Sequence, residues 1–156
     1  MKIKWKNLLV AIAIPLATGG LSAFLTRDAM TDFESLVKPP LSPPGWLFPV
    51  VWTLLYVLMG ISSYIIYQAD ANKIIKRSAI TAYALQLFFN FFWSIIFFNM
   101  KNYLFAFIWL ILLVLTIVAT MIRFKRISDT AFYLLIPYLI WCIFALYLNY
   151  GIYLLN

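Results

Sequence analysis

The sequence predicts an all-α membrane protein, in which one domain of residues 1–156 forms a bundle of five transmembrane helices. Hydrophobic residues make up 65% of the chain and charged residues only 11%, whereas a soluble domain carries about 25% charged residues. So few charges cannot cover a water-facing surface. Five apolar stretches are each long enough to cross a bilayer, which takes about 20 residues, and the charges gather in the segments between them.

The first span is expected at residues 8–26, after a start that contains three lysines. Its apolar part is longer than the core of a typical signal peptide, and no clear cleavage site precedes a soluble region. We therefore interpret it as a retained helix. Four small residues would allow another helix to approach closely: Gly19, Gly20, Ser22 and Ala23.

Residues 27–44 form the one long connection, and its end runs into the second span as KPPLSPPGWLFPVVW, Lys38 to Trp52. Proline fixes φ and restrains the residue before it, so this segment has little conformational entropy left to lose. Two interpretations stay open. The segment is either a rigid connector with Trp46 as an interfacial anchor, or the lid of a ligand pocket, with Pro43 and Trp46 near its rim.

The second, third and fifth spans, expected at residues 45–67, 79–98 and 131–155, each carry polar, aromatic or small residues along one face at helical spacing. The faces are Trp52, Tyr56, Ser63 and Tyr67; Gln86, Asn90, Trp93 and Phe97; and Pro137, Trp141, Ala145 and Asn149. The fourth span, residues 103–124, is almost wholly aliphatic and aromatic. It is the most lipid-like span and the candidate face for a homodimer.

The amides of Gln86, Asn90 and Asn149 are expected to point into the bundle, because an amide in hydrocarbon costs a few kcal/mol. They would either join helices by hydrogen bonds or contact a ligand. The indoles of Trp52, Trp93 and Trp141 are also open to two interpretations. They form a packed core, or they form the walls of a slot for a flat conjugated molecule.

Several classes of function are disfavoured by composition. The chain has no histidine and one cysteine, Cys142, which removes disulfide frameworks, the usual zinc and haem ligands, and histidine-based catalysis. No metal or cofactor is therefore expected. The absence of charged residues well inside the spans argues against an ion channel or proton-coupled pump. The net charge is +7, and the charged residues cluster at the ends of spans, which favours contact with a membrane surface over binding of nucleic acid.

The basic residues also predict an orientation. The N-terminal segment and the second and fourth connections hold nine lysines and arginines, whereas the opposite side holds Arg27, Lys38 and Lys101. The positive-inside rule places the N-terminus in the cytoplasm and the C-terminus outside.

Three segments resemble the TspO/MBR family, the family of the translocator protein or peripheral benzodiazepine receptor: KPPLSPPGWLFPVVWTLLYVLMG, QLFFNFFWSIIFF and PYLIWCIFALYLNY. The resemblance covers nearly the whole chain and suggests a bacterial-type member in the cell membrane. It implies a five-helix bundle, usually a homodimer, that binds protoporphyrin IX and isoquinoline carboxamide drugs. Bacterial members promote the light- and oxygen-dependent degradation of protoporphyrin, which makes an enzymatic role an open question.

The resemblance assigns the reactive positions to Trp52 and Trp141, and pocket positions to Asn90, Trp93 and Ala145. Together with the faces above, the candidate ligand-binding set is Ala23, Pro43, Trp46, Trp52, Tyr56, Gln86, Asn90, Trp93, Phe97, Tyr138, Trp141, Ala145 and Asn149. Two alternatives to degradation are transport of porphyrins or other amphiphiles, and a ligand-responsive sensor or scaffold. Binding of cholesterol is doubtful, because no basic residue follows the tyrosines of LYLNYGIYLLN.

Overall fold

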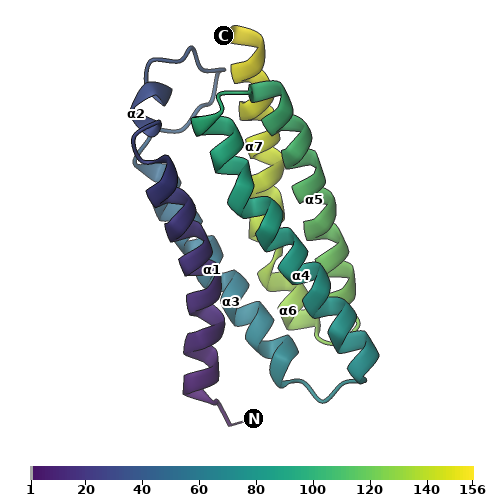
Figure 1. Cartoon of the computed structure of the whole chain (residues 1–156). Coiled ribbons are helices and arrows are strands. Elements are labelled where there is room, and N and C mark those ends of the chain that lie inside the picture. Colours follow the sequence, from purple (N-terminus) through teal and green to yellow (C-terminus); the bar gives the residue numbers. More distant parts are fainter. Residues whose placement is uncertain (1) are drawn as a thin grey trace.

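The computed structural model describes residues 2–156, which include five long helical rods. The rods run along the length of the molecule (Figure 1). The elements are α1 (Trp5–Thr26), α2 (Met30–Phe33), α3 (Leu47–Gln68), α4 (Lys73–Ser94), the π-helix η1 (Ile95–Asn99), α5 (Tyr103–Lys125), α6 (Asp129–Leu134) and α7 (Ile136–Leu155). The rods are α1, α3, α4 with η1, α5, and α6 with α7, and each is long and apolar enough to cross a membrane. The predicted five-helix, all-α architecture is confirmed.

The first and third spans begin well before the apolar pattern indicates. The first begins at Trp5 rather than residue 8, and the third at Lys73 rather than residue 79. The start of α4 is polar but still helical, because the side chain of Asn72 accepts a hydrogen bond from the N–H of Ile74 at 2.8 Å and caps the helix. Hydrophobicity marks the part of a helix in lipid, whereas the hydrogen-bonded helix extends beyond it.

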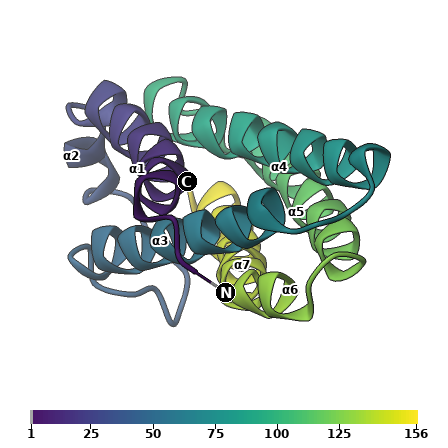
Figure 2. The same ribbon diagram turned by 90° about the horizontal axis from the view of Figure 1, so that it is seen from below.

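The rods form a closed ring when viewed along the bundle (Figure 2). Around the ring, α1 lies beside α3, followed by α6 and α7, then α5, and finally α4, which returns to α1. The termini lie at opposite ends of the bundle, as an odd number of spans requires, and α2 lies at the same end as the C-terminus (Figure 1). Residues far apart in the sequence can therefore converge on the centre of the ring.

The close approach of α1 and α3 depends on a glycine and a proline. Pro15 lacks an N–H, so it cannot donate to the carbonyl of Ala11 four residues earlier. Gly60 of α3 packs at this place. A Cβ added to Gly60 would lie 2.5 Å from Cα of Ile12 and 2.8 Å from the carbonyl oxygen of Ala11. Only glycine allows the two backbones to approach this closely.

The third span changes from α-helix to π-helix at Ile95. The N–H of Ile95 donates to the carbonyl of Phe92, and the carbonyl of Phe91 accepts a hydrogen bond from the hydroxyl of Ser22 at 2.9 Å. A π-helical turn shifts the faces of the residues that follow it, and such turns are frequent at functional sites. This turn also ties α4 to α1 through Ser22.

The connection of residues 27–46, here called the cover segment, is fastened to the C-terminal half of α7. The amide of Asn156 forms two hydrogen bonds with the backbone of Val37, at 2.8 and 3.0 Å. The hydroxyl of Tyr147 donates to the carbonyl of Pro40. Pro39 packs against Gly151, where an added Cβ would lie 2.6 Å from the proline ring. These three hydrogen bonds and the packing of Pro39 therefore hold the cover segment on α7 and Asn156.

Candidate ligand-binding cavity

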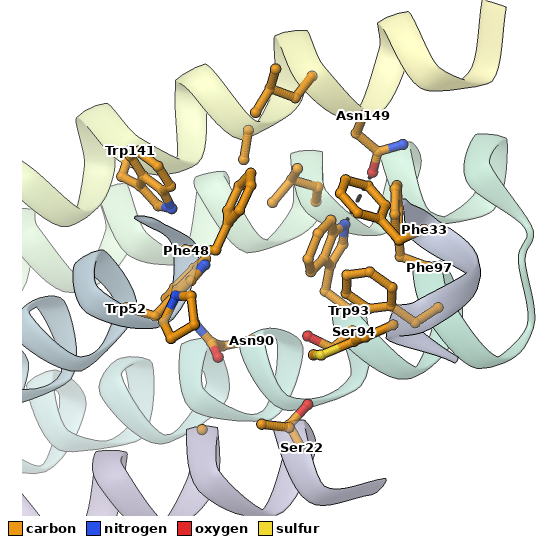
Figure 3. Close-up of a pocket in the computed structure, with 18 of the residues that line it drawn as sticks. Ser22, Phe33, Phe48, Trp52, Asn90, Trp93, Ser94, Phe97, Trp141 and Asn149 are labelled. Atoms are coloured by element: carbon orange, nitrogen blue, oxygen red, sulfur yellow. Dashed lines mark hydrogen bonds between the residues drawn. The ribbon is translucent and has the colours of Figure 1, made fainter. Parts of the chain in front are cut away.

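A cavity of about 330 Å³ lies in the half of the bundle that contains α2, and α1, α3, α4 and α7 contribute most of its wall (Figure 3). Ligand pockets commonly have volumes of about 300–1,000 Å³ and mainly apolar linings. Aromatic and aliphatic side chains form most of this lining, and its few polar groups come from separate helices. The arrangement suits a largely apolar molecule with a small number of directed hydrogen bonds.

Three indoles from three different helices line the cavity: Trp52 from α3, Trp93 from α4 and Trp141 from α7. Trp52 stacks on Tyr56, with ring centres 5.6 Å apart and an interplanar angle of 30°. Phe48 lies edge-on to Trp141, with ring centres 5.9 Å apart. Figure 3 shows Trp52, Phe48 and Trp141 together at one end of the cavity and Trp93 nearer its other end.

The indole nitrogens differ in their availability. Nε1 of Trp93 donates to the side-chain oxygen of Asn149 at 3.1 Å, and Nδ2 of Asn149 donates to the carbonyl of Tyr103 at 2.9 Å. Trp93 therefore has a fixed orientation and offers mainly its ring surface. Within residues 2–156, the indoles that donate a hydrogen bond are those of Trp93 and Trp109, so the N–H groups of Trp52 and Trp141 can each donate to a ligand.

A chain of hydrogen bonds begins at the cavity wall and continues into the bundle. The hydroxyl of Tyr56 donates to Oδ1 of Asn90 at 2.7 Å, and Nδ2 of Asn90 donates to the hydroxyl of Tyr138 at 2.8 Å. The Tyr138 hydroxyl in turn donates to Oε1 of Gln86 at 2.7 Å. Since Asn90 lines the cavity, this chain orients its amide, which retains one N–H and one oxygen lone pair for a ligand.

The cover segment closes the cavity with an aromatic side chain of α2. Phe33 contacts three other phenylalanines at ring-centre distances of 5.6–6.3 Å: Phe48, Phe97 and Phe98. Phe97 also stacks on Trp93 with an interplanar angle of 28°. The π-helical turn lets the consecutive residues Phe97 and Phe98 both reach the lining.

Most of the residues expected at a ligand site line this cavity: Ala23, Trp52, Tyr56, Asn90, Trp93, Phe97, Trp141, Ala145 and Asn149. Gln86 and Tyr138 are each 1% exposed and lie behind the wall, in the hydrogen-bonded chain. Pro43 and Trp46 lie outside the lining, and Trp46 is 69% exposed. Trp46 precedes Trp52 by six residues, which turns it about 120° away around the helix axis, whereas Phe48 and Trp52 share a face.

Sequence reasoning missed part of the lining. Phe33 and Met30 come from the cover segment, and their spacing of three residues, typical of one helical face, was the signal that could have identified them. Ser94 and Phe98 reach the cavity because of the π-helical turn, for which the sequence carries no simple signal. Leu110, Leu113 and Leu148 are ordinary core leucines in sequence and form apolar parts of the wall.

The charged residues of the cover segment differ in whether they reach the cavity. Glu34 is the one charged residue in the lining, within the part of the chain that the structure describes. Arg27 turns back to α1, where its guanidinium donates to the carbonyl of Phe24 and lies over the Phe24 ring. The ammonium group of Lys38 lies over the ring of Phe33 and donates to the carbonyl of Glu34. Neither cation lines the cavity.

Comparison with known proteins agrees with this architecture. The sequence profile of the TspO/MBR family matches residues 11–155. The chain is 39% identical over 151 residues to the tryptophan-rich protein TspO of Chlorobaculum tepidum, with 96% of both chains covered. It is 34% identical over 156 residues to the tryptophan-rich sensory protein of Cereibacter sphaeroides, covering 100% of this chain and 95% of that protein.

A eukaryotic relative is also similar. The translocator protein of Ovis aries is 36% identical over 129 residues, which cover 81% of this chain and 76% of the sheep protein. The match of the family profile over almost the whole length, together with these relatives, shows that this chain belongs to the TspO/MBR family.

Proposed function

We propose that this membrane protein binds a tetrapyrrole of the protoporphyrin type in the cavity and promotes its oxidation by molecular oxygen in light. The observation that supports this proposal best is that Trp52, Trp93 and Trp141 come from three helices and line one cavity. Flat conjugated rings stack on aromatic side chains. Asn90 and the N–H groups of Trp52 and Trp141 would supply hydrogen bonds to polar atoms of the ligand.

In the proposed reaction, light excites the bound porphyrin, which takes one electron from a neighbouring indole. One O₂ molecule then adds across a carbon–carbon double bond at a bridge between two pyrrole rings. That bond breaks, and both oxygen atoms remain in the product as carbonyl groups. The electron returns to the indole as the carbonyls form, so O₂ is the one co-reactant and the tryptophan is restored.

The experiment is to illuminate the purified protein with protoporphyrin IX in air and follow the loss of the Soret absorption band. We expect the double variant Trp52→Phe with Trp141→Phe to bleach the pigment at least several-fold more slowly than the unmodified protein. A matched control is Trp5→Phe with Trp46→Phe, because these indoles are 65% and 69% exposed and lie outside the cavity. Equal bleaching rates in the two double variants would show that the cavity indoles play no part.

Mass spectrometry of the recovered ligand separates this reaction from transport. Degradation predicts a product heavier than protoporphyrin by two oxygen atoms, formed only in light. Unaltered pigment, together with passage of pigment across vesicle membranes, would instead support a carrier of porphyrins or other amphiphiles. Dark binding with neither turnover nor passage would support a sensor.

We further propose that the N-terminus faces the cytoplasm of a bacterial cell and that the cover segment faces outward. The support is the basic residues at the N-terminal end of the bundle, where the connections between α3 and α4 and between α5 and α6 lie. Single cysteines at Asn72 and Ser42 test this orientation with a membrane-impermeant maleimide on intact cells. The native Cys142 is buried and contributes little background. Labelling at residue 72 rather than 42 would reverse the assignment.

A further inference from the structure

The carboxylate of Glu34 lies at the mouth of the cavity, beside the start of α3. Glu34 directly follows α2, and its Oε1 is 3.7 Å from where a Cβ would lie on Gly45. Both residues line the cavity. The exposed acidic group therefore lies where the residue after α2 approaches the end of the cover segment that leads into α3, at the edge through which the outer part of a bound molecule would face water.

Within residues 2–156, no cation forms an ion pair with this carboxylate. Among residues 2–156 the one ion pair joins Nζ of Lys101 to Asp32 at 2.9 Å. The ammonium of Lys38 bonds to the main-chain oxygen of Glu34, at 3.2 Å, and lies 4.8 Å from the centre of the Phe33 ring. Arg27 is held on Phe24, with its guanidinium carbon 3.9 Å from the ring centre. The lining of the cavity therefore carries one formal negative charge.

The other polar groups of the lining are neutral. The hydroxyl of Ser22 donates a hydrogen bond to the carbonyl of Phe91, and Nε1 of Trp93 donates one to the side-chain oxygen of Asn149. The groups that can still donate include the indole N–H groups of Trp52 and Trp141, one N–H of Asn90 and the hydroxyl of Ser94. These groups can bond to a neutral ring, but they do not balance a ligand carboxylate held near Glu34. Glu34 is itself exposed, so its repulsion depends on its position in the lining, within a few ångströms of the outer end of a bound molecule.

We infer that Glu34 determines specificity at this site by selecting a ligand whose outer end is neutral or cationic and disfavouring one that carries carboxylates. The inference rests on the proposed binding of tetrapyrroles, and it restricts the preferred ligands to tetrapyrroles whose outer end carries no carboxylate. A tetrapyrrole with esterified side chains binds more tightly than the corresponding diacid, because it meets Glu34 without charge repulsion. Replacement of Glu34 by the neutral and nearly isosteric glutamine removes this discrimination.

The test compares two probes, protoporphyrin IX and its dimethyl ester, by spectral titration in the dark in an uncharged detergent. The variants are Glu34→Gln and the matched control Asp28→Asn, which removes one negative charge from the same end of the molecule at an exposed residue outside the lining. We expect Glu34→Gln to tighten binding of the diacid about three- to tenfold, the effect of removing one like charge a few ångströms away. The affinity for the ester changes less than about twofold.

Asp28→Asn is expected to leave both affinities within about twofold, because Asp28, exposed like Glu34, lies outside the lining and its charge is separated from the ligand by screening solvent. If Glu34→Gln and Asp28→Asn tighten binding of the diacid equally, the inference is overturned, since the negative electrostatic potential of the protein surface would explain both effects. Equal responses of diacid and ester to Glu34→Gln, or no response of either, would also overturn it while leaving tetrapyrrole binding intact. Failure of every variant to bind either probe would overturn both proposals.

Discussion

The side chain of Asn90 donates to the hydroxyl of Tyr138 at 2.8 Å and so joins α4 to α7 in the interior of the bundle. Asn90 faces the cavity, whereas Tyr138 is 1% exposed and its hydroxyl donates a hydrogen bond to Gln86. Through this pair, the wall of the cavity is connected to the packing of the core. A change behind the wall should therefore affect stability and the orientation of the Asn90 amide together.

Replacement of Tyr138 by phenylalanine should destabilise the protein, because it leaves Nδ2 of Asn90 and Oε1 of Gln86 without their partner. Leaving buried polar groups unsatisfied costs about 1–3 kcal/mol. Tyr83→Phe is the matched control, since the hydroxyl of Tyr83 is the buried side-chain group without a hydrogen bond in residues 2–156. We expect thermal unfolding in detergent to begin several degrees lower for Tyr138→Phe and to be unchanged or raised for Tyr83→Phe. Equal losses would mean that the hydroxyl chain contributes nothing specific.

Replacement of Gly60 by alanine should force α1 away from α3. The added Cβ would meet the backbone of Ile12 at 2.5 Å and of Ala11 at 2.8 Å, and backbone atoms cannot move aside as a side chain does. Overpacking of this kind costs about 1–3 kcal/mol. Gly20→Ala is the control, because no atom lies within 4 Å of its Cβ position. Gly20→Ala should stabilise α1 by about 0.5–1 kcal/mol, because alanine loses less conformational entropy than glycine in a helix. Opposite shifts of the unfolding midpoint are expected, and shifts of the same sign would contradict the close approach.

Replacement of Asn149 by leucine should weaken ligand binding by releasing the indole of Trp93. The change removes the acceptor for Trp93 Nε1 and the hydrogen bond to the carbonyl of Tyr103. We expect the dissociation constant for protoporphyrin to rise about three- to tenfold, the usual effect of losing one hydrogen bond. The same substitution combined with Trp93→Phe supplies the check, because phenylalanine has no N–H to orient. If the two changes are additive, Asn149 does not act through Trp93.

The ion pair between Lys101 and Asp32 should retain the cover segment over the cavity. The hydrogen bond and charge of Asp32 raise the pKa of the Lys101 ammonium above its ordinary value of 10.5. A raised pKa means that the folded state favours the protonated form, so the contribution is present at neutral pH and is lost as the pH rises through the pKa of the folded state. We expect ligand release, measured by stopped-flow absorbance, to be constant near neutrality and to accelerate above about pH 10.5.

Lys101→Asn provides the complementary measurement at neutral pH. Lys101 has a positive φ of 53°, a conformation that asparagine accepts readily, so this substitution removes the charge with little change in backbone strain. Release should accelerate by up to about fivefold, as expected for an exposed ion pair, and high salt should reduce the difference. The control Asp28→Asn should release the ligand at the normal rate. A variant with unchanged release at every salt concentration would show that the cover does not depend on this pair.

Much of the fold could be predicted from the sequence, because lipid imposes its requirements on each segment separately. A helix that crosses a bilayer must be about 20 residues long and apolar, so all five spans were evident without knowledge of their neighbours. The burial of the amides of Gln86, Asn90 and Asn149 was also predictable, since none can face hydrocarbon without a partner. The periodicity of α3, α4 and α7 likewise indicated which faces point inward.

Only the tertiary structure decided which inward-facing residues reach the cavity and which lie behind its wall. Trp52 and Tyr138 both face inward, yet only Trp52 lines the cavity, because Asn90 of the neighbouring helix lies in the wall and Tyr138 packs behind it. The position of Phe33 over the cavity depends on contacts between the cover segment and α7, which are remote in sequence. The sequence by itself determined the helices and their apolar faces through local requirements of the lipid. The crossing of α1 with α3 and the π-helical turn, which arise from contacts between helices, decided the shape of the cavity.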